Sequence, residues 1–300
     1  MAEARAWLQI GLMLLTWSLV DTALTADNLR PFVAVPSTGS TLEEVVAGVK
    51  HKLEAGGIEI VGQYAPYADD SAVIIGATTP ELLAAAGARP YAGFGAVMRV
   101  AVTNNKGRLE VSYTNPVYMG YAYRIGDLST VGAQFASALG IGEPFGARGL
   151  TPAELEEYHY NLRMPYFKAR QFITHFGSHE EGVTKTRAAL RYPAADMGFL
   201  WEVRISPTQT LFGVDLRGGK WQGRMKRIMD KIDIATPRST ASLPWELLVN
   251  DRELVYLPGR FRIAVMFPDL TMIGFMTIAE VPDNMDESAA GLAKLIEGMR

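Results

Sequence analysis

GAVMRVAVTNNKGRLEVSYTNPVYMGY, residues 95–121, is the stretch that decides the fold of this 300-residue chain. Two runs rich in β-branched and aromatic residues flank the tetrapeptide Asn104-Asn105-Lys106-Gly107. Asparagine and glycine tolerate the left-handed backbone of a tight turn, so the two runs are predicted to pair as a β-hairpin. Pro116 has no backbone N–H and is typical of the point where a strand ladder ends.

The residues before the hairpin predict a helix that leads into a further strand. Thr41 and Glu44 have the spacing of a capping box. Apolar residues then recur at helical spacing until Gly56 and Gly57 end the pattern. A second helical stretch, 128–139, follows the hairpin. Helices gathered on one side of a mainly antiparallel sheet make an α+β fold.

The second half of the chain repeats this order of features. Residues 181–190 are helical in pattern, and FLWEVRIS at 199–206 is typical of a strand. We match 243–275 to the first hairpin by placing Pro268 on Pro116. This alignment pairs Arg108 with Arg260, Leu109 with Phe261, Val111 with Ile263, and Met119-Gly120 with Met272 and Gly274.

The repeat predicts two tandem related domains. The first covers 27–140 and the second 181–300, and 141–180 is a linker. Thr151 and Pro152 place a capping residue and a proline at the start of a helix within this linker.

The run from Gly107 to Pro116, followed by Tyr118-Met119, resembles the signature of the domain-of-unknown-function 302 family. The resemblance extends to the helix–glycine–strand pattern at 41–61. The second half is a divergent match, because Val265-Met266-Phe267 stand where tyrosine and asparagine are expected. The resemblance implies the fold and no catalytic residue, since the family has no assigned general activity.

Residues 1–26 have the pattern of a secretory signal. Arg5 precedes an uncharged run from Ala6 to Val20, and small residues lead to Ala26, after which cleavage is expected. Fifteen residues span about 22 Å as a helix, less than the ~30 Å of a bilayer core. An uncleaved anchor and a buried helix remain alternatives. We expect a soluble periplasmic or secreted protein with no stable membrane span after cleavage.

The amino-acid composition of the chain excludes several classes of function. The chain has no cysteine, which excludes disulfides, thiolate metal sites and a cysteine nucleophile. The net charge is −3, and loss of residues 1–26 leaves 28 basic and 30 acidic side chains. No broad basic face is therefore expected, and nucleic acid is not a predicted partner. The basic residues of 217–227 are interpreted as a solvated helix face or a patch for an acidic partner.

Metal and haem sites have only weak sequence support. His175 and His179 are four residues apart, which on a helix would place both on one face, but Gly177 lies between them. Methionines 266, 272, 276 and 285 are close in sequence, and thioethers bind monovalent copper. Core packing is the more usual role of methionine. No cofactor is predicted, and copper or haem is kept as the alternative.

A polar and aromatic segment around the linker helix is our first choice for a binding surface. Tyrosine presents an apolar ring and a polar tip, which suits recognition. Packing of the linker onto one domain is the alternative, and Asn115 can instead cap the next helix. The candidate ligand-binding residues are Tyr113, Asn115, Tyr158, His159 and Tyr166.

Trp201-Glu202 and Trp245-Glu246 each place a carboxylate beside a large aromatic ring. Because neighbouring residues of a strand face opposite ways, we expect buried tryptophans and solvated glutamates. No catalytic constellation emerges, so whether the protein is an enzyme stays open. The sequence predicts a non-enzymatic protein that binds a small ligand or a periplasmic protein partner. A redox, metal-associated or haem-associated accessory protein or enzyme is the alternative.

Overall fold

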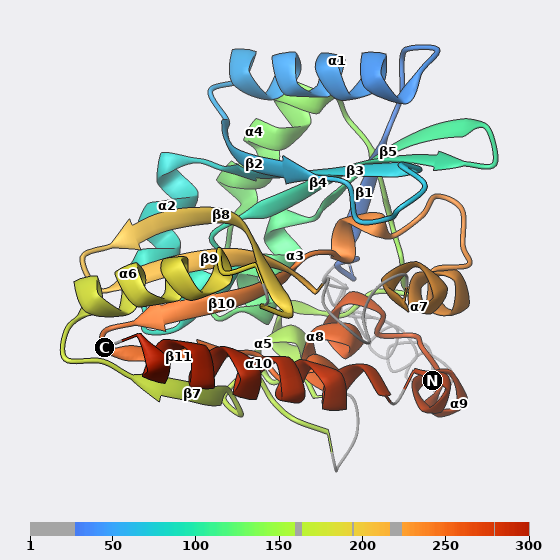
Figure 1. Ribbon diagram of the computed structural model, residues 1–300. Coiled ribbons are helices and arrows are strands. Elements are labelled where there is room, and N and C mark those ends of the chain that lie inside the picture. The colour runs from blue at the N-terminus through green and yellow to red at the C-terminus, as the bar shows by residue number, and fades with distance from the viewer. Residues whose placement is uncertain (1–27, 160–163, 194, 217–223, 279, 300) are drawn as a thin grey trace, which may run out of the picture.

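The computed structural model describes residues 28–159, 164–193, 195–216, 224–278 and 280–299 (Figure 1). The expected signal at 1–26 lies outside the described residues, as do residues 217–223 of the basic segment 217–227. Two antiparallel sheets with helices form the protein, so the predicted α+β class is confirmed. Among the described residues, no helix has the length and apolar character needed to cross a membrane.

The first sheet has six strands in the order β2-β3-β4-β5-β1-β6. Its strands are β1 (Phe32–Val35), β2 (Glu59–Tyr64), β3 (Ala72–Thr78), β4 (Met98–Asn105), β5 (Arg108–Thr114) and β6 (Glu143–Phe145). Its helices are α1 (Leu42–Ala55), α2 (Pro80–Gly87), the short 3-10 helix η1 (Ala92–Gly95), α3 (Pro116–Ala122) and α4 (Ser129–Leu139).

The second sheet has five strands in the order β7-β11-β10-β9-β8. Its strands are β7 (Gln171–His175), β8 (Met197–Ser206), β9 (Gln209–Leu216), β10 (Trp245–Asn250) and β11 (Glu253–Tyr256). Its helices are α6 (His179–Leu190), α7 (Arg224–Ile232), the 3-10 helix η3 (Thr240–Ser242), α8 (Gly259–Met266), α9 (Met272–Thr277) and α10 (Glu280–Gly298). Helix α5 (Pro152–Glu156) lies between the two sets, as the sequence predicts.

The two sheets follow the same path through the chain. In each, a strand and a helix are followed by two strands, a helix, a 3-10 turn, a hairpin and closing helices. The spatial order is also the same, since β8-β9-β10-β11-β7 corresponds to β2-β3-β4-β5-β1. Strands β6 and β7 fall within the segment expected as a linker, so both sheets extend into it.

The local signals in the first half act as expected. Thr41 and Glu44 form the capping box of α1. In the β4–β5 turn, Lys106 and Gly107 have positive φ, and the Gly107 N–H donates to Asn104 Oδ1 at 2.8 Å. Asn115, for which the sequence left both lining a cleft and capping a helix open, caps α3 by accepting from the Val117 N–H.

The alignment of Pro268 with Pro116 is wrong. Residues 259–266 form helix α8, whereas their expected counterparts around 108–114 form strand β5. We call each sheet with its helices a unit. The hairpin of the second unit has its turn at Asp251, earlier in the chain than the alignment places it, so Asn250 corresponds to Asn105. Phe261, Ile263 and Val265 alternate like a strand, although they belong to a helix in which every residue except Arg260 is buried.

The sheets pack face to face, and helices cover their outer faces (Figure 1). Helix α1 lies over the first sheet, and α6 lies over the second. Trp201 on β8 fills the space between the sheets, where it meets three glycines. A Cβ on Gly213 of its own sheet would lie 2.3 Å from the indole Cε2, and one on Gly62 or Gly76 of the opposite sheet would come within 3.2 Å. The glycines therefore make room for the ring.

The 3-10 helix of each unit packs on the sheet of the other unit. Helix η1 contacts β9 and β10, and η3 contacts β4 and β5. Asn250 Oδ1 accepts from the N–H of Tyr91, the residue before η1, at 3.1 Å. The corresponding Asn105 donates from Nδ2 to Thr236 Oγ1, in the segment that leads to η3, at 3.3 Å. The two units therefore contact each other through equivalent elements.

Candidate functional site

The face of the first sheet that meets the second unit carries an unusual set of polar residues. Side chains of a strand alternate between its two faces. Val100, Val102 and Tyr113 point to the helix-covered face, and the intervening positions point to the second unit. These positions are Arg99, Thr103, Glu110, Ser112 and Thr114, all of them buried. A polar face buried between two sheets requires partners from both units.

At the centre of this face lies a buried ion cluster made by both units. Arg99 Nη1 on β4 donates to Glu246 Oε1 on β10 at 2.6 Å. Arg262 on α8 donates from Nε to Glu246 Oε2 at 2.9 Å and from Nη2 to Oε1 at 3.1 Å. The exposed fractions of these three residues are 1%, 5% and 4%. One carboxylate therefore receives two guanidinium groups away from water.

The cluster carries one more positive charge than negative charge. Burial lowers the pKa of Arg99, while the Glu246 carboxylate opposes that shift. Arg99 Nε also donates to Ala241 O, and Arg262 Nη2 to Pro244 O. Within the described residues, Arg262 Nη1 has no hydrogen-bond partner, whereas a side-chain hydrogen bond with Tyr123 adds to the contacts of Arg99. A buried N–H group of a cation is costly to leave unpaired, so this cluster has unused capacity for an acceptor.

An apolar pocket reaches this cluster from the surface. It lies between α7 on one side and α8 with the start of β10 on the other. Its walls carry three methionines, Met225, Met229 and Met266, and both Trp245 and Arg262 line it. The unpaired Arg262 Nη1 and the unpaired Trp245 Nε1 belong to these lining residues. The lining residues are Met225, Ile228, Met229, Ile232, Ser242, Leu243, Trp245, Arg262, Ile263, Met266 and Phe267.

The pocket is narrow. The room for centres of water-sized molecules is about 30 Å³, whereas one buried water needs roughly 10–15 Å³. Methionine side chains are unbranched and adapt to the shape of a guest. Such a pocket suits a slender apolar body that ends in a group able to accept hydrogen bonds from a cation.

The candidate residues predicted from sequence do not come together as one site. Tyr113 packs on Phe135 of α4, with ring centroids 5.7 Å apart, and burial raises its pKa to about 12. It therefore lies on the helix-covered face of the first sheet rather than between the units. Asn115 caps α3 and donates from Nδ2 to Arg30 O at 2.9 Å.

The other three candidates do meet. His159 stacks on Tyr166 with ring centroids 4.3 Å apart. The Tyr158 hydroxyl donates to Ala264 O of α8 at 2.9 Å. Tyr158 and His159 line an open pocket together with Arg148, Glu154, Glu157 and Asp269. This segment holds the linker against the second unit, and its ligand-binding role stays a prediction.

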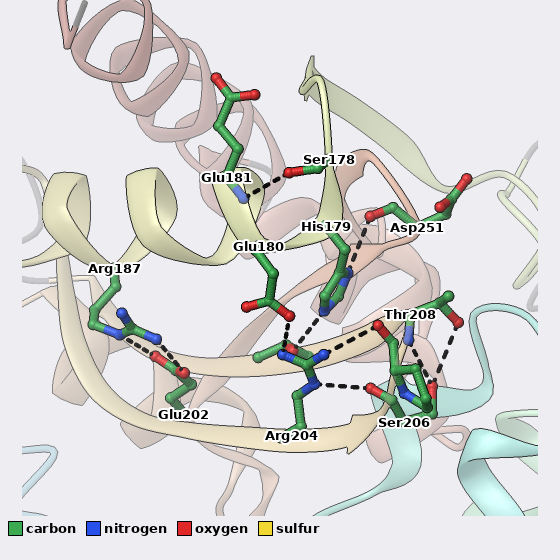
Figure 2. Close-up of polar contacts among 12 residues, drawn as sticks. Ser178, His179, Glu180, Glu181, Arg187, Glu202, Arg204, Ser206, Thr208 and Asp251 are labelled. Atoms are coloured by element: carbon green, nitrogen blue, oxygen red, sulfur yellow. Dashed lines mark hydrogen bonds and ion pairs between the residues drawn. The ribbon is translucent and has the colours of Figure 1, made fainter.

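His175 and His179 have different surroundings. His175 is an exposed residue of β7, and His179 begins α6 and is buried. The His179 imidazole points toward Asp251 (Figure 2), with Nδ1 3.0 Å from Asp251 O and Nε2 3.0 Å from Thr210 Oγ1. Both ring nitrogens are thus engaged, and Thr210 is fully buried. The described residues contain no group of three or more histidine, aspartate or glutamate side chains placed to hold a metal.

The expectation for the two tryptophan–glutamate pairs is confirmed for one pair and wrong for the other. Trp201 is buried, and Glu202 forms a two-pronged ion pair with Arg187 near the surface (Figure 2). Glu246 is buried with Arg99 and Arg262 instead of being solvated. The reason is that the first sheet covers the strand face that an isolated sheet would leave in water.

Sequence reasoning missed Arg99 and Arg262. Each stands within an apolar run, VMRVAV and RFRIAVM, that becomes a buried strand or helix. An arginine inside such a run is rare unless it is paired, and this signal was available in the sequence.

Among solved structures, the chain is similar to the crystal structure of an uncharacterized conserved protein DUF302 from Bacillus stearothermophilus. The identity is 16%, the TM-score is 0.31, and the match covers 37% of this chain and 95% of that chain. No family model matches the chain, and no curated protein matches it.

Proposed function

We propose that this protein binds a small organic anion with an apolar body, such as a medium-chain carboxylate, in the pocket beneath α7. The observation that carries the proposal is the surplus buried cation in the lining of a mainly apolar pocket. Arg262 lines the pocket and has an unpaired Nη1, and Glu246 is already shared with Arg99. An anion in the pocket would balance the surplus charge and accept from the free Arg262 Nη1.

The lining of the pocket supports a flexible apolar guest. Its walls are apolar from Met225 on α7 to Phe267 after α8, and a guest longer than the two or three water positions now open would enter by movement of the methionine side chains. Burying each CH₂ group of a chain contributes about 0.8 kcal/mol. The carboxylate would add charge-assisted hydrogen bonds that a neutral alcohol cannot match. Binding, rather than catalysis, is the role that these groups support.

We further propose that the chain is exported and consists of two tandem copies of one α+β unit. Residues 1–26 support export, and the shared strand order of the two sheets supports duplication. Amino-terminal sequencing of the protein from its native source tests the first point, because cleavage after Ala26 leaves Asp27 as the first residue.

The binding proposal is tested with decanoate that carries a bromine near the end of its chain. Bromine quenches tryptophan fluorescence at contact distance, and Trp245 lines the pocket. We expect saturable quenching that Trp245→Phe removes while unlabelled decanoate still binds by calorimetry. Decanol and decylammonium should bind at least about tenfold more weakly than decanoate.

Two variants separate the apolar and the charged parts of the site. Ile228→Glu places a like charge in the pocket wall and should abolish decanoate binding, whereas Ile234→Glu, on a side chain that is 75% exposed, should not. Arg99→Met removes the surplus charge without touching the lining and should weaken decanoate but not decanol. Equal affinity for decanoate and decanol, or no quenching at all, would refute the proposal.

A further inference from the structure

A second, polar cleft lies on the other flank of α7. It opens between the β4–β5 hairpin of the first unit and α7 of the second, and its room for water-sized molecules is about 250 Å³. That volume admits several non-hydrogen atoms, because one water position needs roughly 10–15 Å³. The cleft is lined by Tyr67, Asp69, Ser71, Thr103, Asn104, Asn105, Lys106, Lys226, Met229, Asp230, Asp233, Arg238 and Thr240.

Asp233 is a buried carboxylate in the wall of this cleft. Its exposed fraction is 3%, and its Oδ1 accepts from the Ser239 N–H at 2.7 Å. In the described part of the chain, no lysine, arginine or histidine forms an ion pair with it. Burial raises its pKa to about 6, although the Ser239 N–H and Arg238 act against the shift. A carboxylate in this position is stabilised by any cation that enters the cleft.

Thr103 supplies an independent sign that the cleft is built for a guest. Its exposed fraction is 7%, and it lines the cleft from β4. Within the described residues, the Thr103 hydroxyl has no hydrogen-bond partner. Buried hydroxyl groups are normally paired, so an unpaired one that lines a cavity marks a place for a ligand or water atom.

The chain itself shows which chemistry the cleft accepts. The Lys226 ammonium lies 3.1 Å from Asp230 Oδ2, 3.8 Å from Asp69 Oδ2 and 6.0 Å from the centre of the Tyr67 ring. Carboxylates and an aromatic ring around an ammonium are the usual surroundings of a bound amine. The deeper carboxylate, Asp233, and the Thr103 hydroxyl offer a similar set of partners to a second ammonium.

We propose that this cleft is a binding site for an aliphatic amine, whose ammonium group donates to Asp233 and Thr103. A diamine fits better than a monoamine, because its second ammonium can replace that of Lys226 between Asp69 and Asp230. Site and ligand are independent of the carboxylate pocket, although Met229 lines both. Either proposal can therefore fail without the other.

The experiment is calorimetric titration of the full chain with 1,4-diaminobutane at neutral pH, with 1,4-butanediol as the uncharged probe. We expect the diamine to bind and the diol to bind at least about tenfold more weakly. Asp233→Asn keeps an acceptor for the Ser239 N–H and should lower the affinity at least about tenfold. Thr103→Val should also lower it, and should fold normally because the hydroxyl that it removes is unpaired.

Asp70→Asn is the matched control, since Asp70 is an exposed neighbour of the cleft that does not line it. Its affinity for the diamine should equal that of the unmodified protein. Unchanged affinity in Asp233→Asn and Thr103→Val would overturn the proposal. So would equal binding of diamine and diol, or displacement of the diamine by calcium ions at similar concentration, which would mark an inorganic cation site instead.

Discussion

The buried ion cluster predicts a strong asymmetry between two substitutions that each remove one charge. Glu246→Gln leaves two guanidinium groups buried without a counter-charge, whereas Arg99→Met leaves the neutral pair of Glu246 and Arg262. The first change should therefore destabilise the protein far more than the second. The free energy of unfolding is the quantity compared.

The magnitudes follow from the contacts. Breaking a fully buried ion pair by removing one partner costs about 3–5 kcal/mol, and Glu246 is the partner of both arginines. Arg99→Met loses the ion pair with Glu246, whose carboxylate keeps Arg262 as its partner. It also loses the hydrogen bond from Nε to Ala241 O, which leaves a carbonyl unpaired at a cost of about 1–3 kcal/mol. It also removes the surplus buried cation, which offsets that loss. We expect Arg99→Met to stay within about 1 kcal/mol of the unmodified protein.

The assay is urea unfolding, followed by tryptophan fluorescence and far-ultraviolet circular dichroism in the absence of added carboxylate. A ligand would stabilise the folded state and hide the difference. Coincident transitions from the two probes justify converting the shift in midpoint into a free energy. If Arg99→Met lost as much stability as Glu246→Gln, the reasoning from surplus charge would be refuted.

Two further predictions concern single buried positions. Burial raises the pKa of Asp233 to about 6, so the folded state holds a proton that the unfolded state has already released, and stability falls as pH rises from about 4 to about 6. Asp233→Asn should remove that loss of stability, which is at most about 3 kcal/mol. The measurement is the urea midpoint of both proteins between about pH 4 and about pH 6. If the midpoint of the variant fell with pH as much as that of the unmodified protein, Asp233 would not be the group responsible. Gly213→Ala would place Cβ 2.3 Å from the Trp201 indole and should cost about 1–3 kcal/mol in thermal unfolding. Gly48→Ala in α1 is the control, because its new Cβ meets nothing within 4 Å; it should stabilise the protein by about 0.5–1 kcal/mol. Similar changes in unfolding temperature for the two variants would argue against the packing role of Gly213.

Local features of the first half could be predicted because each depends on a few neighbouring residues. The capping box of Thr41 and Glu44 and the turn at Lys106-Gly107 are decided by local hydrogen bonds and by the conformational freedom of glycine. The register of the second unit could not be predicted in the same way. Its buried helix α8 is apolar on nearly every side, so periodicity does not distinguish it from a strand.

The candidate site was beyond sequence reasoning for a different reason. Arg99, Glu246 and Arg262 are separated by up to 163 positions, and only the packing of one sheet on the other brings them together. The sequence pattern placed Glu246 in water because a lone sheet has one solvated face, and the partner sheet removed that water. Thr103 and Asp233 face one cleft for the same reason.

The sequence by itself determined the α+β class, the first hairpin, the helices α1, α4, α5 and α6, and the absence of thiol chemistry. These depend on local hydrogen bonding, side-chain periodicity and composition. Only the tertiary structure decided which polar side chains are buried together and where the cavities lie. Burial and pairing are properties of two surfaces in contact, and the energy of a charge depends on whether water or another charge surrounds it.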